Sequence, residues 1–190
     1  MLATLTRQGR PDRQFAPTAG PVGSVGYASL KVLIVEDNHH MRTIIKTIVQ
    51  SVGFRDVKEA PDGASAFEIL QTFSPDIIFL DAAMTPIDGA EFTRHTRNTA
   101  GGNPYVPIIM ISGHSSKGQI ERARDAGITE YVTKPMTAKA LLGRINAVIM
   151  RPRPFIKCAS YFGPDRRRQK SITHQGPWRR QDDHNEVAFD

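Results

Sequence analysis

The sequence has only one cysteine, Cys158, among 190 residues, and it lacks long apolar runs. A single cysteine excludes an intramolecular disulfide and any metal cluster built from several cysteines, and it fits a reducing compartment. No apolar run approaches the roughly 18 residues that a membrane-crossing helix needs. The first residues give way at once to Arg7, Arg10 and Arg13, unlike the apolar core of a signal peptide. We therefore expect a cytoplasmic protein with no membrane segment.

Excess positive charge is absent from the central part of the chain. The formal net charge is +6, but residues 30–150 carry equal numbers of basic and acidic side chains, and the excess lies in the flanking segments. A domain that binds nucleic acid through its fold normally concentrates positive charge on that fold. Residues 1–28 contain several prolines and glycines without a helical or strand period. We predict a disordered extension at residues 1–28, one domain at 29–151, and a basic, disordered tail at 152–190.

Short apolar runs alternate with amphipathic stretches from Leu30 onwards, which is typical of a parallel α/β fold. The predicted strands are Lys31–Val35, Val57–Ala60, Ile77–Leu80, Val106–Ile111 and Tyr131–Thr133. Four helices should begin after a capping side chain, at Asn38, Asp62, Asp88 and Thr137, and a shorter helix is expected over Lys117–Ala126. The first helix carries one apolar stripe from Met41 to Val52. Right-handed crossovers then predict a doubly wound, flavodoxin-like α/β fold with a five-stranded parallel sheet of order 2-1-3-4-5.

Polar side chains follow four of the predicted strands directly. They are Glu36 and Asp37 after the first strand, Asp81 after the third, Ser112 after the fourth and Lys134 after the fifth. Since the carboxyl ends of parallel strands meet at one edge of the sheet, these side chains should converge. Three carboxylates at close range repel each other unless a cation neutralises them, and their hard oxygens suit Mg²⁺ or Mn²⁺. Asp81 would then be a nucleophile for a phosphoryl group whose oxygens contact Lys134 and Ser112.

The polar residues lie in four short stretches, Val35–Asn38, Leu80–Met84 with Asp88-Gly89, Ile111–Gly113 and Tyr131–Pro135. These stretches resemble the receiver domain of two-component response regulators, and the resemblance covers residues 30–150. It implies phosphorylation of Asp81 and Mg²⁺ held by Glu36, Asp37, Asp81 and the backbone carbonyl of Ala83. It also implies a cis bond before Pro135. Tyr131 matches the aromatic position that responds to phosphorylation together with the Ser112 hydroxyl.

Two positions depart from the family pattern. The sequence reads Met84-Thr85-Pro86 where the family usually has proline directly after the methionine, which leaves the loop conformation beyond Asp81 open. Ala83, two residues after Asp81, offers no polar side chain to orient a hydrolytic water. We therefore hypothesise that dephosphorylation depends on His114, two residues after Ser112, or on an external partner. The neighbouring histidines, His39 and His40, are expected to face solvent or a partner rather than a metal.

We interpret the chain as a stand-alone response regulator with a basic tail, a phosphoacceptor rather than an enzyme. The expected phosphodonor is a sensor histidine kinase or a histidine phosphotransfer protein, and the output is contact with an unidentified downstream protein. One rival is a receiver whose basic tail binds nucleic acid, since arginines lie beside Tyr161, Phe162 and Trp178, although that tail could also fold back on the receiver. A second rival is a phosphatase or phosphotransferase of related topology, which would need a cap for which no sequence remains.

Overall fold

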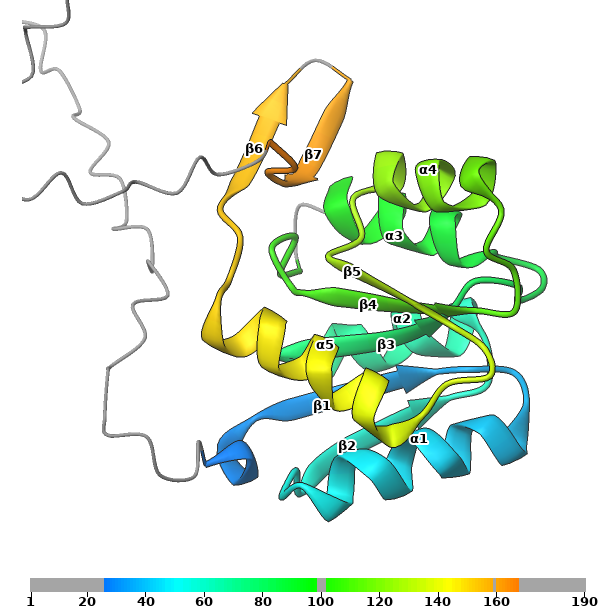
Figure 1. Ribbon diagram of the computed structural model, residues 1–190, viewed down its shortest axis with the longest axis vertical. Coiled ribbons are helices and arrows are strands. Elements are labelled where there is room, and N and C mark those ends of the chain that lie inside the picture. The colour runs from blue at the N-terminus through cyan, green and yellow to red at the C-terminus, as the bar shows by residue number, and fades with distance from the viewer. Residues whose placement is uncertain (1–25, 99–101, 159, 168–190) are drawn as a thin grey trace, which may run out of the picture.

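Strands and helices alternate through the residues that the computed structural model describes, which are 26–98, 102–158 and 160–167. The strands of the main sheet are β1 (Lys31–Val35), β2 (Asp56–Ala60), β3 (Ile77–Asp81), β4 (Ile108–Ser112) and β5 (Glu130–Thr133). All of them are parallel, in the order β2-β1-β3-β4-β5 (Figure 1). The predicted fold class and strand order are therefore confirmed.

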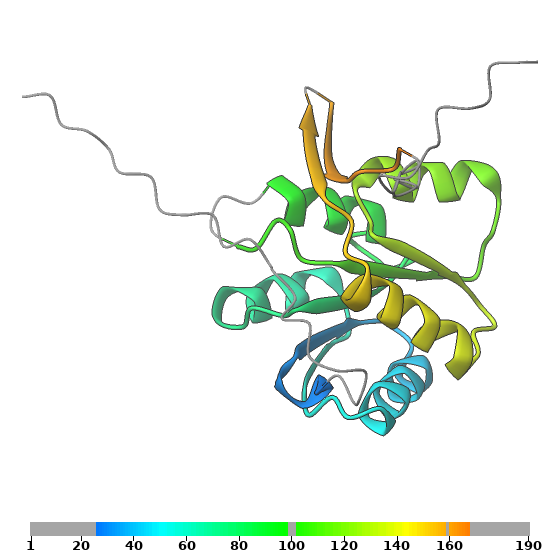
Figure 2. The ribbon, with the colours of Figure 1, turned by 60° about the vertical axis from the view of Figure 1, so that its left-hand side comes forward.

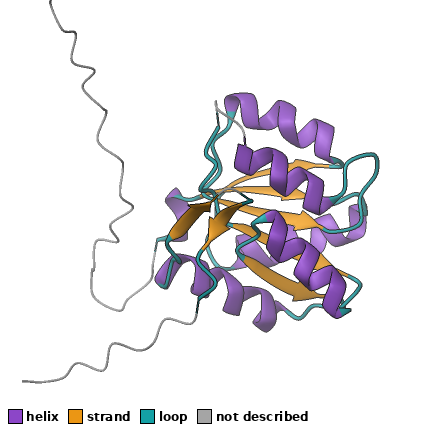
Figure 3. Cartoon of the chain, turned by 90° about the horizontal axis from the view of Figure 1, so that it is seen from above, coloured by secondary structure: helices purple, strands orange, loops and turns teal. Residues whose placement is uncertain are grey.

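Five helices connect the strands and cover both faces of the sheet (Figure 3). They are α1 (His39–Ser51), α2 (Gly63–Thr72), α3 (Gly89–Asn98), α4 (Lys117–Ala126) and α5 (Ala138–Met150), preceded by a 3₁₀ turn at Tyr27–Ser29. The four predicted capping side chains accept hydrogen bonds from backbone N–H groups of the first helical turns, at 2.8 to 3.1 Å. In the described part of the chain, no helix combines the length and apolar character needed to span a membrane.

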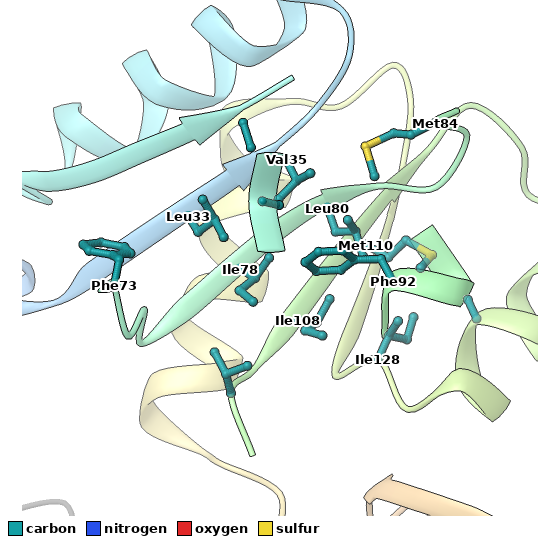
Figure 4. Packing of buried hydrophobic residues seen from close by; sticks show 14 residues of the cluster. Leu33, Val35, Phe73, Ile78, Leu80, Met84, Phe92, Ile108, Met110 and Ile128 are labelled. Atoms are coloured by element: carbon teal, nitrogen blue, oxygen red, sulfur yellow. The ribbon is translucent and has the colours of Figure 1, made fainter. Parts of the chain in front are cut away.

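Successive residues of each strand point to opposite faces, so the core has two halves. On one face Leu80, Met110 and Phe92 pack with residues of α2, α3 and α4 (Figure 4). The other half lies under α1 and α5. Full burial of one such side chain contributes about 1.5–3 kcal/mol. The predicted stripe on α1 is too wide, because Ile45 and Val49 are buried whereas Ile44 is 46% exposed.

The chain continues past α5 into a two-stranded antiparallel sheet of β6 (Phe155–Cys158) and β7 (Tyr161–Pro164). This corrects the prediction of a disordered tail from residue 152. The rings of Phe155 and Phe162 each meet Tyr105, which precedes β4, with centroids 5.5 and 5.3 Å apart. Aromatic contacts thus replace the apolar periodicity that the sequence lacks there. The expected disorder of residues 1–25 and 168–190 lies outside the described residues.

Candidate functional site

The residues predicted for the site lie at the carboxyl edge of the sheet. Asp81 and Ser112 are the last residues of β3 and β4, and Glu36 and Lys134 directly follow β1 and β5. Parallel pairing aligns the strand ends, with Asp81 opposite Ile111 in β4. Asp81, Glu36 and Ser112 are buried, with exposed fractions of 5%, 1% and 3%. Sheet register therefore brings together residues that lie far apart in the sequence.

Lys134 joins two of the carboxylates directly. Its Nζ donates to Asp81 Oδ1 at 2.6 Å and to Glu36 Oε2 at 3.1 Å. Burial alone would lower the pKa of Lys134, but hydrogen bonds and charge from Asp81 and Glu36 outweigh it and raise that pKa. Burial, followed by the nearby charge of Asp81, raises the pKa of Glu36 against the opposing effect of Lys134. The ammonium group thus compensates part of the negative charge, but burial and the charge of Asp81 still destabilise the ionised form of Glu36.

Carboxylate oxygens of Glu36, Asp37 and Asp81 all lie within 4.8 Å of one another. Asp37 is exposed, so the cluster opens to solvent on its side. An oxygen-only set of this kind, with one open side and more negative charge than Lys134 compensates, fits a hard divalent cation such as Mg²⁺. The Ala83 N–H donates to Asp81 Oδ2 at 2.9 Å, so Ala83 lies beside the cluster, and its carbonyl as a metal ligand remains a prediction.

Ser112, His114 and Tyr131 meet through the backbone of His114. The His114 N–H donates to Ser112 Oγ at 3.1 Å, and the Tyr131 hydroxyl donates to the His114 carbonyl at 2.7 Å. The two residues expected to act as a switch pair are therefore connected by one peptide segment. The His114 side chain is exposed, and its role in dephosphorylation stays a prediction.

His39 and His40 are exposed in the first turn of α1, and neither belongs to the carboxylate cluster. Nδ1 of His39 instead lies 3.3 Å from Nη2 of Arg42. The bond between Lys134 and Pro135 is cis, as the resemblance implied, and the bond between Thr85 and Pro86 is cis as well. The unusual placement of proline after Met84 therefore comes with a second cis bond beside the site.

Sequence reasoning missed an ion pair behind the site. Asp88 was expected as a helix cap, and its Oδ1 does accept the Glu91 N–H at 2.8 Å. Its Oδ2 also accepts a hydrogen bond from Nη2 of Arg122 in α4 at 2.6 Å. Asp88 and Arg122 line a small cavity together with Ser112 and Tyr131. Only the fold reveals this pair, because the two residues are 34 positions apart in the sequence.

Gly89 is the first residue of α3, directly after the loop that carries Asp88. A Cβ placed on Gly89 would lie 2.5 Å from the backbone oxygen of Asp81 and 3.0 Å from Ala82 Cα. The loop can therefore pass directly behind Asp81 only because residue 89 has no side chain. Gly113, which directly follows Ser112, has open space around it instead.

Comparison with known proteins agrees with this geometry. The response regulator receiver domain family matches residues 32–146. The chain belongs to this family. The chemotaxis protein CheY of Pseudomonas aeruginosa is 33% identical over 122 residues, which cover 64% of this chain and 98% of that protein. CheY-3 of Vibrio cholerae is 30% identical over 123 residues, covering 65% and 94%.

Solved structures show the same receiver fold. CheY4 of Vibrio cholerae has a TM-score of 0.59 and 28% identity, covering 63% of this chain and 98% of that one. The receiver domain of a Pseudomonas aeruginosa sensor histidine kinase has a TM-score of 0.58 and 30% identity, covering 64% and 98%. That domain holds a magnesium ion in its active-site cleft. The antiparallel strands β6 and β7 lie beyond the family match, which ends at residue 146.

Proposed function

We propose that this receiver accepts a phosphoryl group on Asp81 from a phosphohistidine and signals through contact with another protein. The observation that carries the proposal is the Lys134 ammonium bound to Asp81 and Glu36 inside a cluster of three carboxylates. A cation-compensated carboxylate at the edge of a doubly wound sheet is suited to phosphoryl transfer, which depends on positioning and charge stabilisation. The proposed donors are a sensor histidine kinase or a histidine phosphotransfer protein.

In the proposed reaction an oxygen of Asp81 forms a bond to phosphorus while the phosphorus–nitrogen bond breaks. The electron pair of that bond returns to the imidazole of the donor, which takes up a proton. Glu36, Asp37, Asp81 and the Ala83 carbonyl would hold Mg²⁺, which when bound offsets the negative charge of the carboxylates and phosphoryl oxygens. Lys134, bonded to Asp81 Oδ1 at 2.6 Å, keeps Asp81 oriented and supplies a fixed positive charge.

The Ser112 hydroxyl has a second part in this proposal. It now accepts the His114 N–H, and turning toward a phosphoryl oxygen would release that N–H. The His114 carbonyl is bonded to Tyr131, so a change at Ser112 reaches the aromatic side chain through one residue. We propose that Ser112 and Tyr131 respond together to phosphorylation.

A small phosphodonor tests the proposal without a kinase. Acetyl phosphate with Mg²⁺ should add the mass of one phosphoryl group to the native protein, as measured by intact mass spectrometry. Asp81→Asn should prevent the addition, and chelation of Mg²⁺ should slow it strongly. Asp56→Asn is a matched control, because Asp56 is an exposed aspartate in β2. Equal labelling of native protein and Asp81→Asn would refute the assignment.

Dephosphorylation tests the role of His114 separately. If the His114 side chain helps to position the hydrolytic water, His114→Ala should lengthen the lifetime of the phosphorylated form. An unchanged lifetime would favour control by an external partner. Hydrolysis of small phosphomonoesters with turnover would instead favour a phosphatase of related topology.

The tail gives no independent support for a nucleic-acid-binding output. Its described residues contact the domain itself, and Arg166 hydrogen-bonds to backbone carbonyls rather than projecting freely. Steep salt dependence of DNA or RNA binding, lost on truncation after Arg151, would reverse this preference.

A further inference from the structure

The C-terminal hairpin, residues 154–158 and 160–167, lies against the ends of α3 and α4, at the edge of the sheet opposite Asp81 (Figures 1 and 2). Its backbone touches the residue that ends α4. A Cβ on Gly163 would lie 2.8 Å from Gly127 Cα, and a Cβ on Gly127 would lie 2.6 Å from the Phe162 carbonyl oxygen. Gly127 also needs glycine for its φ of +98°. The two glycines therefore allow backbone-to-backbone contact between hairpin and domain.

Arg166 fastens the hairpin to the carboxyl end of α4. Its Nη2 donates to the Ile128 carbonyl at 2.6 Å and lies 3.4 Å from the Arg124 carbonyl. The last carbonyls of a helix lack partners within the helix and carry partial negative charge. The Arg124 carbonyl already accepts the Gly127 N–H at 2.9 Å, and the Ile128 carbonyl lies two residues beyond α4, so the guanidinium is an additional donor at this helix end, and docking depends on where that end lies.

Arg97 of α3 bonds to the backbone segments against which the hairpin packs. This residue is 4% exposed, and its guanidinium donates to the carbonyls of Gly127, Pro104 and Val106 at 2.7 to 3.0 Å. The same guanidinium lies 5.0 Å from the centroid of the Phe155 ring. Arg97 thus ties the end of α4 to the segment before β4 while the hairpin covers it.

Two contacts connect α4 to the phosphorylation site, one from Arg122 in the middle of the helix and one from the segment before its first turn. Arg122 pairs with Asp88, on the loop that passes behind Asp81, at 2.6 Å. The segment that leads into α4 contains His114, bonded to both Ser112 and Tyr131. α4 is ten residues long, so its two ends are about 15 Å apart at 1.5 Å rise per residue. A displacement of this short rigid helix at the site end changes its position at the hairpin end.

We propose that the hairpin acts as a latch, meaning that its docking holds α4 in place. Hairpin docking and occupation of Asp81 then oppose each other through this helix. The proposal rests on the proposed function, because it takes the phosphoryl site as the input. In the described structure Ser112 accepts the His114 N–H and the hairpin is docked. Occupation of Asp81 draws Ser112 away, shifts α4 and loosens the hairpin. By linkage, a loosened hairpin strengthens binding at Asp81 by the same factor.

Beryllofluoride with saturating Mg²⁺ serves as the probe, because it binds an aspartate as a phosphoryl analogue. Hydrogen exchange followed by mass spectrometry reports the hairpin peptides, and calorimetry reports the affinity of the site. Occupation should accelerate exchange in the hairpin. Arg166→Ala should increase the affinity for beryllofluoride about fivefold or more, the lower end of common coupling strengths. Gly163→Ala should act in the same direction, since an added Cβ would lie 2.6 Å from the Tyr161 hydroxyl and 2.8 Å from Gly127 Cα, which leaves the docked hairpin no room for it.

Arg167→Ala is the matched control. It removes the same charge one residue later, from a side chain that is 80% exposed and, among the described residues, pairs within the hairpin with Asp165. Its affinity for beryllofluoride should equal that of the native protein. Binding at Asp81 with unchanged hairpin exchange and unchanged affinity in Arg166→Ala would overturn the latch alone. If native protein fails to bind the probe at Asp81, the proposed function and the latch fall together.

Discussion

Replacing Lys134 with methionine tests how the charge of the site is held. The substitution preserves most of the side-chain volume and removes the ammonium that bonds to Asp81 and Glu36. Removing one partner of a buried ion pair costs about 3–5 kcal/mol. Because the Lys134 side chain is 24% exposed, we expect a loss at or below the lower limit of this range, about 2–3 kcal/mol in the free energy of unfolding at pH 7 without Mg²⁺.

The pH dependence of this loss follows from two shifted groups. The folded pKa of Lys134 is raised above 10.5, so its stabilising contribution is present at neutral pH and disappears only as pH rises through that raised value. The folded pKa of Glu36 is raised above 4.5, so ionised Glu36 costs stability as pH rises through its folded pKa. Without Lys134 that cost grows. The loss in Lys134→Met should therefore shrink as pH falls below the folded pKa of Glu36.

Urea unfolding with and without Mg²⁺ provides the assay. A ligand that binds only the folded state adds about 2.7 kcal/mol at one hundred times its dissociation constant. Mg²⁺ should stabilise Lys134→Met more than native protein, since the cation no longer competes with an ammonium group. Lys117→Met is the control, because Lys117 is 90% exposed and lies 3.8 Å from Glu121, and it should change stability by less than about 0.5 kcal/mol. Equal losses in both variants, without a Mg²⁺ effect, would refute the reasoning.

Three further outcomes follow from the structure. Arg97→Met leaves two buried carbonyls and one partly buried carbonyl without their donor, so urea unfolding should show a loss of about 2–4 kcal/mol, and a loss under 1 kcal/mol would contradict it. Gly89→Ala forces a methyl group against the Asp81 backbone and should impair labelling by acetyl phosphate. Gly113→Ala meets open space and should label normally. Equal labelling of the two variants would contradict the inference that the loop needs glycine at position 89. Calorimetry should show Mg²⁺ binding more tightly as pH rises through the raised pKa of Glu36, a dependence that Glu36→Gln should remove.

The sheet order and the helix starts could be predicted because they depend on local patterns. The capping side chains lie three residues from the N–H groups they accept, so sequence spacing is sufficient to find them. The strand expected from Val106 begins instead at Ile108, because Pro107 has no N–H for the sheet ladder. Strand ends also predict which polar residues share the site edge, since parallel register is regular.

The remaining features depend on contacts that spacing cannot reveal. The pair of Asp88 and Arg122 needs the loop after β3 and the middle of α4 to be placed in space. The hairpin is stabilised by Tyr105, Phe155 and Phe162, aromatic residues from two separate segments with no repeating pattern. Its docking also uses backbone carbonyls, which every residue has. The residue types therefore do not show which backbone carbonyls accept these hydrogen bonds.

The docked hairpin also determines where the described part of the polypeptide ends on the domain. Glu130 of β5 pairs with Arg144 of α5 and Arg153 just before the hairpin, at 3.2 and 3.4 Å, so the route from α5 is held by charge as well as by packing. Residue 167, the last residue that the structure describes, is therefore held close to α4, and the segment that follows it in the sequence carries four basic and four acidic side chains. A protein that bound both α4 and that segment would experience millimolar effective concentration for its second contact. Modest individual affinities would then suffice for a selective complex.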